Sequence, residues 1–326
     1  MKIKLANLDY SVIDTKEKIT IADSFVVRQN KIGDGNGEAK LYIGNDNNET
    51  RRFFGTNGFS IDCIILKKDL QKYLDETQAE YQKPEQPYKQ RDSLPSLWLQ
   101  RKRKIDALPD IIEFTVVEQT QITGPRVYVK SHSNSIAYNL IRELSLPNIT
   151  YISIIKLLSD SGKLLFYFRL FAYYFGDVQH PYILTKEEEN IENTNVSTEV
   201  KLQLRNARIG QGEYRKNLLD QCPFCPITLI SDDRLLIASH IKPWAVSNAF
   251  EKTDPKNGFM FTPTFDHLFD RGFISFTDDK RTILSPFLSN MTYSKLGISD
   301  NKLIPQLPIE GRELYLEYHR SNILKR

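Results

Sequence analysis

The chain has 326 residues and a mass of 37.8 kDa, which exceeds what one hydrophobic core usually organises, so two domains are expected. Apolar residues make up 40% and charged residues 26%, a balance that excludes a mainly disordered or fibrous chain. The formal net charge of +3 is only mildly basic, so a nucleic-acid surface would have to come from local clustering of Lys and Arg. The odd count of 3 Cys argues against a disulfide framework and favours a reducing compartment.

The sequence contains no pattern typical of membrane insertion. Its first ten residues lack the continuous apolar stretch of a signal peptide. The most apolar segment, Leu164–Phe175, is interrupted by Arg169 and is shorter than the roughly 20 residues that a membrane span needs. We therefore expect a buried core element there, no contact with membranes, and a cytoplasmic location.

The region up to about residue 175 mixes strand-like and helical patterns. Residues 19–22 and 24–28 are rich in apolar and β-branched residues and predict strands. Leu66–Leu74 has apolar residues at helical spacing, and Ile111–Val117 predicts a further strand. The region is expected to be α+β, and no motif in it identifies a chemistry.

Residues 76–110 differ in composition from their surroundings, with several Pro, Gln and Lys and the basic run 101–104. With aromatic residues nearby, the segment could be a basic arm that stacks on bases and contacts phosphates through Arg101 and Arg103. A solvated loop, kept soluble by its charges, would have the same composition. Both interpretations remain open from the sequence.

Residues 185–199 are polar, acidic and nearly devoid of large apolar side chains, a profile typical of a linker. This predicts an N-terminal domain of residues 1–184, a linker of residues 185–199 and a C-terminal domain of residues 200–326.

The C-terminal domain contains a predicted ββα unit. Leu235–Ile241 predicts a strand that ends before a proline, and Gly258–Phe261 predicts a second, short strand. Thr262, with its hydroxyl as N-cap, and Pro263 predict a helix start, and Gly272 predicts its end.

Within this helix, Phe265, Leu268 and Phe269 share one face and should pack on the two strands. At about 100° per residue, Asp266 lies at the edge of that face and His267 points nearly away from it. A side chain that reaches a site between helix and strands is therefore expected to be Asp266, with His267 as the less favoured candidate. His240 lies at the end of the first strand, where it could open onto a cleft.

These stretches together resemble the HNH endonucleases of the ββα-metal type, in the branch found in restriction enzymes. The resemblance covers roughly residues 200–326 and is carried by the following segments: Arg208–Arg215, Cys222–Thr228, Ala238–Trp244, Asn257–Gly258 and Phe265–Gly272.

The resemblance implies a role for each matching residue. His240 occupies the position of the general base, and Asn257 occupies the middle position, where it braces the loop and orients that histidine. Asp266 occupies the last motif position, that of a metal ligand. The implied cofactor is one divalent ion, Mg²⁺ or Mn²⁺, which carboxylates bind well. Flanking phosphates could be contacted by a few cations: Arg215, Lys242 and Arg271.

The chain departs from the family pattern at two places. Many relatives carry Asp or His directly before the base as a second metal ligand, and this chain has Ser239 there. Some relatives bind a structural zinc through two Cys-x-x-Cys pairs, whereas here Cys222 and Cys225 form one pair and the third cysteine, Cys63, is far upstream. A structural zinc is therefore not expected.

The resemblance implies an α+β protein in which a mixed α/β recognition domain precedes an HNH nuclease domain. Its function would be that of a restriction endonuclease, type II or modification-dependent, acting on double-stranded DNA as a homodimer. The alternative is a non-catalytic DNA-binding protein built on a decayed nuclease fold. A small-molecule enzyme in the N-terminal domain has no supporting motif.

Overall fold

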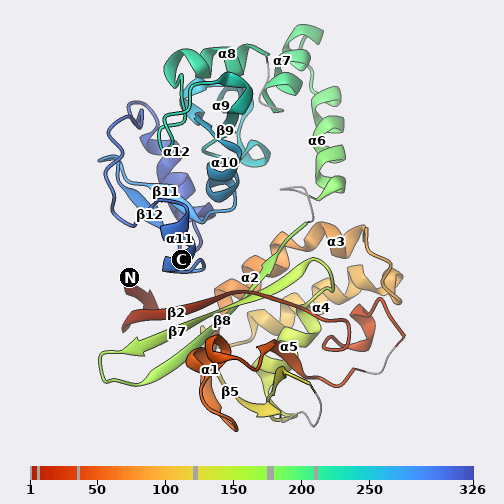
Figure 1. The fold of residues 1–326 in the computed structure, drawn as a ribbon. Coiled ribbons are helices and arrows are strands. Elements are labelled where there is room, and N and C mark those ends of the chain that lie inside the picture. The colour runs from red at the N-terminus through yellow and green to blue at the C-terminus, as the bar shows by residue number, and fades with distance from the viewer. Residues whose placement is uncertain (1, 6–7, 35–36, 120–123, 175–179, 209–211) are drawn as a thin grey trace. The chain divides into compact units, whose positions relative to one another are not determined.

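The computed structural model describes residues 2–5, 8–34, 37–119, 124–174, 180–208 and 212–326. Contacts within the chain divide it into two compact units, Met1–His180 and Pro181–Arg326. The N-terminal unit is a mixed α/β fold and the C-terminal unit contains the ββα arrangement, as the sequence predicts (Figure 1).

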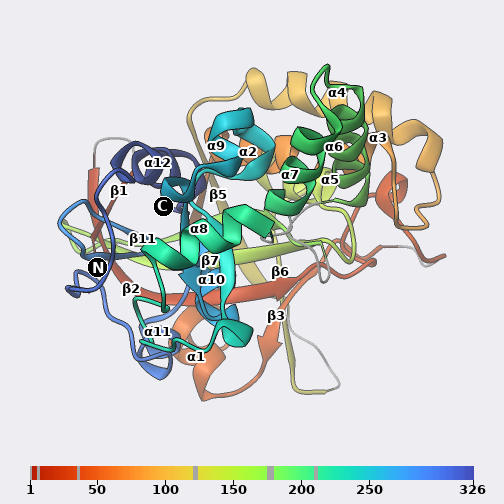
Figure 2. The same ribbon diagram turned by 90° about the horizontal axis from the view of Figure 1, so that it is seen from above.

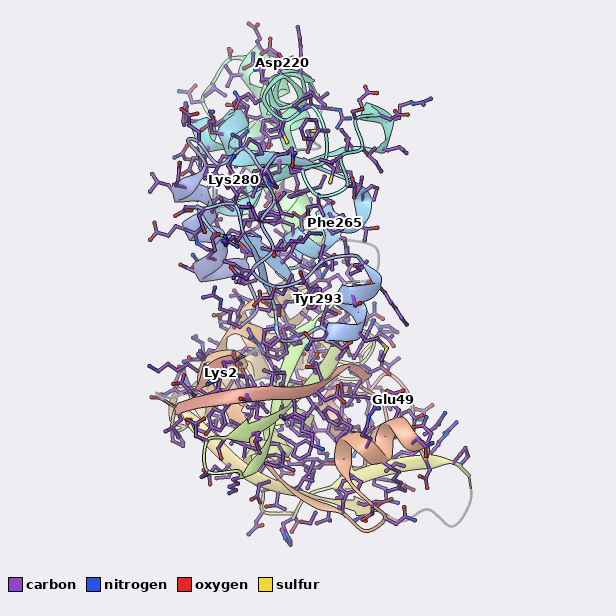
Figure 3. The ribbon with its side chains drawn as sticks, turned by 60° about the vertical axis from the view of Figure 1, so that its left-hand side comes forward. Lys2, Glu49, Asp220, Phe265, Lys280 and Tyr293 are labelled. Atoms are coloured by element: carbon purple, nitrogen blue, oxygen red, sulfur yellow. The ribbon has the colours of Figure 1, made fainter. Side chains whose placement is uncertain are left out.

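A single sheet of eight described strands organises the N-terminal unit, in the order β1-β2-β7-β8-β4-β5-β6-β3. Neighbouring strands are antiparallel except β4 and β8, which are parallel. Lys2, labelled in Figure 3, lies on the edge strand β1. The strands have the following bounds: β1 Lys2–Leu5, β2 Leu8–Thr20, β3 Leu41–Asn45, β4 Ser60–Leu66, β5 Ile111–Gln119, β6 Arg126–Lys130, β7 Thr150–Ser159 and β8 Leu164–Ala172.

The centre of this sheet is buried on both faces. Strands β7 and β8 are buried along most of their length, which confirms that the apolar segment from Leu164 is a core element; Phe175 lies outside the described residues. Arg169 interrupts the run without reaching solvent, because its Nε lies 3.4 Å from the buried Asp69 carboxylate. Each buried leucine, isoleucine or phenylalanine side chain of β7 and β8 stabilises the fold by about 1.5–3 kcal/mol.

Helices cover the sheet of the N-terminal unit. Their bounds are α1 Asn48–Phe54, α2 Lys67–Glu76, α3 Gln78–Gln82, α4 Leu94–Asp106 and α5 Ile136–Leu144, with short 3₁₀ turns η1 Arg28–Asn30 and η2 Arg91–Ser93. The predicted helix 66–74 and strand 111–117 are confirmed as α2 and β5. The predicted strand 24–28 is wrong, since these residues form a turn that leads into η1, and the strand predicted at 19–22 ends with β2 at Thr20.

The interpretation of residues 76–110 as a basic arm with stacking aromatic residues is wrong, and the solvated-loop interpretation holds for residues 83–90 but not for the helices. The segment folds into α3 and α4, and its aromatic side chains Tyr81, Tyr88 and Trp98 are buried, so they do not form a stacking surface. Arg101 is only 3% exposed, and its guanidinium donates to the Tyr81 hydroxyl at 2.6 Å and to Asn30 Oδ1 at 2.8 Å. Arg101 is therefore a core residue, and the predicted phosphate contact at this position is wrong.

The predicted linker is largely helical. Residues 185–193 belong to α6 (Pro181–Asn193), and residues 198–199 begin α7 (Thr198–Arg208). Ile191 and Leu204 are buried within the C-terminal unit. Polar composition alone does not distinguish an irregular linker from a helix that buries one narrow stripe.

The C-terminal unit continues from α6 and α7 through short helices and hairpins, which Figure 2 shows from above. Its remaining elements are α8 Gly212–Gln221, η3 Asp233–Leu235, β9 Ile237–His240, η4 Trp244–Val246, α9 Ala249–Thr253, η5 Pro255–Asn257, β10 Gly258–Phe261, α10 Pro263–Asp270, β11 Ile274–Phe276, β12 Thr282–Leu284, α11 Asn290–Lys295, α12 Glu313–Tyr318 and the π-helical turn His319–Ile323.

The ββα unit forms where the sequence predicts it, but its first strand is shorter than the predicted 235–241, because residues 233–235 form the turn η3 and β9 covers only Ile237–His240. Strands β9 and β10 pair antiparallel, with His240 opposite Gly258, and α10 packs on both. Phe265, labelled in Figure 3, is buried on the inner face of α10 with Leu268 and Phe269. Gly272 has a φ of +66° and ends the helix as predicted. In the described part of the chain, no helix is both long enough and apolar enough to cross a membrane.

Candidate active site

His240 is the last residue of β9, and its ring is enclosed by aromatic side chains. The ring stacks on Tyr214 with centroids 4.4 Å apart and meets the Trp244 ring edge-on at 5.8 Å. Its Nε2 lies 3.1 Å from the carbonyl oxygen of Lys252. Because a carbonyl only accepts, Nε2 carries the proton and Nδ1 of the neutral ring holds the lone pair. Burial lowers the pKa of His240 to about 4, so the ring is neutral at neutral pH.

Asn257 fixes the loop that holds this histidine. Its side chain is fully buried; Oδ1 accepts from the backbone N–H of Lys242 at 2.7 Å, and Nδ2 donates to the carbonyl of Glu251 at 3.0 Å. Nδ2 also lies 3.2 Å from the Lys242 carbonyl. The Glu251 carbonyl immediately precedes the Lys252 carbonyl that anchors His240. Asn257 therefore braces both ends of the loop that positions the imidazole.

The same loop is reinforced by charge. Residues Asn248 and Glu251 form a capping box at the start of α9. The Glu251 carboxylate also accepts two hydrogen bonds of 2.7 Å from Lys242 Nζ, and this pair lowers the pKa of Glu251. Lys242 is thus held in an ion pair beside His240.

Gly258 allows the close approach that seats Tyr214 under the histidine. A Cβ at this position would overlap the Tyr214 hydroxyl and lie 2.9 Å from Leu218 Cδ2 and 3.1 Å from the Ser239 carbonyl. The Tyr214 hydroxyl donates to the Asn257 carbonyl at 3.2 Å. Glycine is therefore required here by space, and its φ of −164° is ordinary extended backbone.

An acidic pair on α10 faces β9. Asp266 and Asp270 are four residues apart and therefore neighbours on the helix surface. Ser239 donates its hydroxyl proton to Asp270 Oδ1 at 3.1 Å. Burial raises the pKa of Asp266, with the Ser239 hydroxyl acting in the opposite direction. Burial and the neighbouring Asp266 carboxylate raise the pKa of Asp270 to about 8.

Asp270 was not among the residues predicted for the site. The family position for a second ligand is occupied by Ser239, and the structure brings the Asp270 carboxylate to that serine instead. Asp270 lies four residues after Asp266 on the predicted helix, so the two side chains are neighbours on its surface. This spacing is the signal in the sequence that points to Asp270. His267 is exposed, as the predicted helix rotation requires.

The base candidate and the acidic pair lie on different sides of the end of β9. Successive side chains of a strand point to opposite faces. Ser239 points to α10, where it bonds Asp270, and His240 points to the Tyr214 ring of α8. The described contacts include no hydrogen bond between His240 and either aspartate. A substrate group that reached both would have to lie across the end of the strand.

The acidic pair fits a hard divalent cation. The pKa values of both carboxylates are raised, which means that the surrounding protein does not fully compensate their negative charge. Carboxylate oxygens are also the ligands that Mg²⁺ and Mn²⁺ prefer. The described residues contain no group of three or more His, Cys, Asp or Glu side chains arranged for a metal.

The two cysteines of the Cys-x-x-Cys pair are buried thiols. Cys222 Sγ lies 3.4 Å from the Phe224 carbonyl, and burial raises the pKa of this thiol. Cys225 Sγ lies 3.9 Å from Thr262 Oγ1. Thr262 is the N-cap residue of α10, but its hydroxyl makes no capping hydrogen bond, so the predicted side-chain cap is wrong.

The predicted phosphate contacts differ in their surroundings. The Arg215 guanidinium donates to the carbonyls of Leu236 at 3.0 Å and Asp233 at 2.5 Å, which braces the approach to β9. Arg271 follows Asp270 at the end of α10 and is half-buried. Arg103 is exposed on α4. The resemblance segment begins at Arg208, and residues 209–211 lie outside the described residues.

Comparison with known proteins identifies the region that carries this site. No curated protein matches the chain. Residues 225–277 match the HNH_2 family, described as HNH endonuclease, and the matched segment includes His240, Asn257, Asp266 and Asp270. HNH nucleases generally use a divalent metal ion. This match confirms the predicted resemblance to the HNH endonucleases for residues 225–277, which lie within the C-terminal unit.

Proposed function

We propose that this protein is a metal-dependent DNA endonuclease of a restriction system, type II or modification-dependent. The observation that carries the proposal is the pairing of a neutral, braced His240 with an acidic pair across the end of one strand. A decayed, non-catalytic fold has no need to keep His240, Asn257 and the two aspartates in this arrangement.

His240 is proposed as the general base. Its Nε2–H is held by the Lys252 carbonyl, so Nδ1 is the atom that takes a proton from the attacking water. The water oxygen then forms a bond to phosphorus as the bond from phosphorus to the 3′ oxygen breaks. Asn257 acts as a positioning residue, because it holds the loop that supplies the anchoring carbonyl.

Asp266 and Asp270 are proposed to hold one divalent ion, Mg²⁺ or Mn²⁺. The chemistry that such an ion supplies when bound is stabilisation of negative charge on the phosphate oxygens and on the leaving 3′ oxygen. The ion would also compensate the charge of the two carboxylates, whose raised pKa values disfavour their ionised forms in its absence. Arg271, which follows Asp270, is proposed to contact a flanking phosphate, as is Arg103 on the N-terminal unit.

The decisive experiment is nicking of supercoiled plasmid DNA by the full chain with Mg²⁺ or Mn²⁺ and with excess chelator. We expect metal-dependent nicking that is lost in Asp266→Ala and retained in His267→Ala. DNA binding without nicking under every metal condition would favour the alternative, a non-catalytic DNA-binding protein. Nicking by Asp266→Ala at the wild-type rate would overturn the ligand assignment.

Cleavage of both strands is proposed to require a second copy of the chain, because one ββα unit carries one candidate site. Sedimentation of the protein on a short duplex measures the number of chains bound. A single chain that linearises plasmid without accumulating nicked circles would contradict the homodimer.

A further inference from the structure

The N-terminal unit contains a cavity of about 520 Å³ whose charged lining residues are mostly basic. Four cations line it: Arg28, Lys31, Lys89 and Arg142. Asp34 is the acidic residue in the lining, which makes the formal charge of the charged lining residues +3 (four cations minus one carboxylate). Glycines at 33 and 37 bring backbone rather than side chains to the same wall.

These cations come from segments that the structure ties together. Arg28 belongs to η1, and Arg142 to the last turn of α5. The backbone N–H of Lys89 donates to the Lys31 carbonyl at 2.8 Å, so the two segments that carry these lysines are hydrogen-bonded. Arg142 Nε donates to the Phe25 carbonyl at 2.9 Å, which fixes the plane of its guanidinium.

A buried polar network holds η1 in place. Asn30, the last residue of η1, is fully buried and donates to the carbonyls of Glu143 and Ser145, both at 2.7 Å. Its Oδ1 accepts from the buried Arg101 at 2.8 Å. Arg101 therefore contributes to this cavity indirectly, by fixing the turn on which Arg28 stands.

The lining cations differ in how far they are already neutralised. Lys89 forms an ion pair with Asp34, and Lys31 Nζ lies 3.9 Å from Asp23. Within the described part of the chain, Arg28 has no ion-pair partner, and its side chain is exposed at the rim. The surplus of positive charge around a cavity of this size suits a phosphate group, which Arg can bind through two parallel hydrogen bonds.

We propose that this cavity is an anion site that binds a phosphate of DNA during recognition by the N-terminal unit. The proposal rests on the proposed nuclease function, which supplies DNA as the polyanion that this unit would meet. A free mononucleotide carries the same phosphate chemistry, and the test separates the two sources.

The test measures binding of a short fluorescent duplex to the full chain in chelator, so that no cleavage occurs. We expect the double variant R28Q/K89Q to bind about tenfold more weakly at 0.1 M salt, and its plot of log affinity against log salt to be shallower by about 1–2. Asp34→Asn should tighten binding, because it removes the negative charge from the lining. The matched control is Lys163→Gln, since Lys163 is exposed and ion-paired to Asp62 elsewhere on the unit.

Three results would overturn the assignment. Equal affinity and salt slope for R28Q/K89Q and wild type would show that the cavity does not meet DNA, while wild-type plasmid nicking would leave the nuclease function standing. Stabilisation of wild type by dAMP, abolished in R28Q/K89Q without any loss of duplex affinity, would assign the cavity to a free nucleotide. Wild type that neither binds nor cleaves DNA would refute both proposals together.

Discussion

His240 is kept neutral by its surroundings rather than by its intrinsic acidity. Burial against Tyr214 and Trp244 lowers the pKa of His240 to about 4, well below the ordinary value of 6.5. The neutral form is therefore present throughout the range above about pH 5. What the site requires of this residue is a fixed lone pair on Nδ1, which the hydrogen bond from Nε2 to Lys252 provides.

Replacement of His240 by Ala should reduce cleavage by at least about 100-fold, the usual contribution of a general base. Affinity for uncleaved duplex should change by less than about threefold, because the base acts on water and not on the DNA backbone. The measurement is single-turnover nicking together with duplex binding in chelator. His267→Ala is the matched control, since His267 is exposed on α10. If His267→Ala does not cleave DNA and His240→Ala does, His240 is not the general base.

The raised pKa of Asp270 makes a prediction about stability. Its folded-state pKa of about 8 lies above the ordinary 3.8, so the folded protein binds more protons than the unfolded chain between these values. Without metal, stability should therefore fall as pH rises from about 4 to about 8. Asp270→Asn removes this cost and should raise the unfolding temperature of metal-free protein at pH 8 by about 3 °C or more, while lowering metal-dependent nicking.

The control for this stability measurement is Asp220→Asn, because Asp220 is exposed on α8 (Figure 3). It should leave the unfolding temperature unchanged. Added Mn²⁺ should stabilise wild type more at pH 8 than at pH 6, because the ion competes with protons for the carboxylates. An Asp270→Asn variant that unfolds at a lower temperature than wild type at pH 8 in chelator would contradict the raised pKa.

At the scale of elements, local sequence signals predict the ββα unit, whereas other elements, such as helix α4, depend on packing between residues that are distant in sequence. Strand β10 and helix α10 have the predicted bounds because Pro263 begins the helix shortly after the strand ends and Gly272 follows the end of the helix. Helix α4 lies in the segment for which the composition predicts an arm or a loop, although its buried residues 94, 98, 101 and 105 follow helical spacing. Arg101 is one of them, and a buried arginine is recognisable only once its partners, Asn30 and Tyr81, are known.

The same distinction applies to the site. His240, Asn257 and Asp266 were assigned from the motif and the helix period, but Asp270 depends on a hydrogen bond from Ser239 across two elements. The basic cavity depends on segments around residues 28, 31, 89 and 142, which are distant in sequence. No local sequence pattern predicts that these residues line the same cavity.

Gly258→Ala should destabilise the C-terminal unit by about 1–3 kcal/mol, the range for overpacking a well-packed site. The added methyl group would overlap the Tyr214 hydroxyl, and Ser239 backbone 3.1 Å away limits relaxation. The measurement is the free energy of unfolding in denaturant. The second change Tyr214→Phe removes the overlapping oxygen, so the double variant should recover part of the loss; if the two losses simply add, the overlap is not the cause.

At the scale of the whole molecule, the division into two units predicts a division of labour. The C-terminal unit contains the HNH domain, and phosphate contacts around a ββα unit carry little sequence information. Sequence preference is therefore expected to reside in residues 1–180. The structure also sets where the chain should be cut: α7 packs on α8 and α9, so a fragment must begin at Pro181 and not at residue 200.

The fragment 181–326 should nick DNA slowly and at many sequences, whereas the full chain should cut at a restricted set of sites. Slow cleavage is expected because the fragment lacks the backbone contacts proposed for the N-terminal unit, and each lost phosphate contact lowers the affinity for DNA, most strongly at low salt. A time course of plasmid nicking measures the rate, and sequencing the ends that each protein generates from modified and unmodified genomic DNA measures the preference. His240→Ala in the fragment is the control for contaminating nucleases. If the fragment reproduces the site preference of the full chain, recognition lies within the C-terminal unit, and the role proposed for residues 1–180 is wrong.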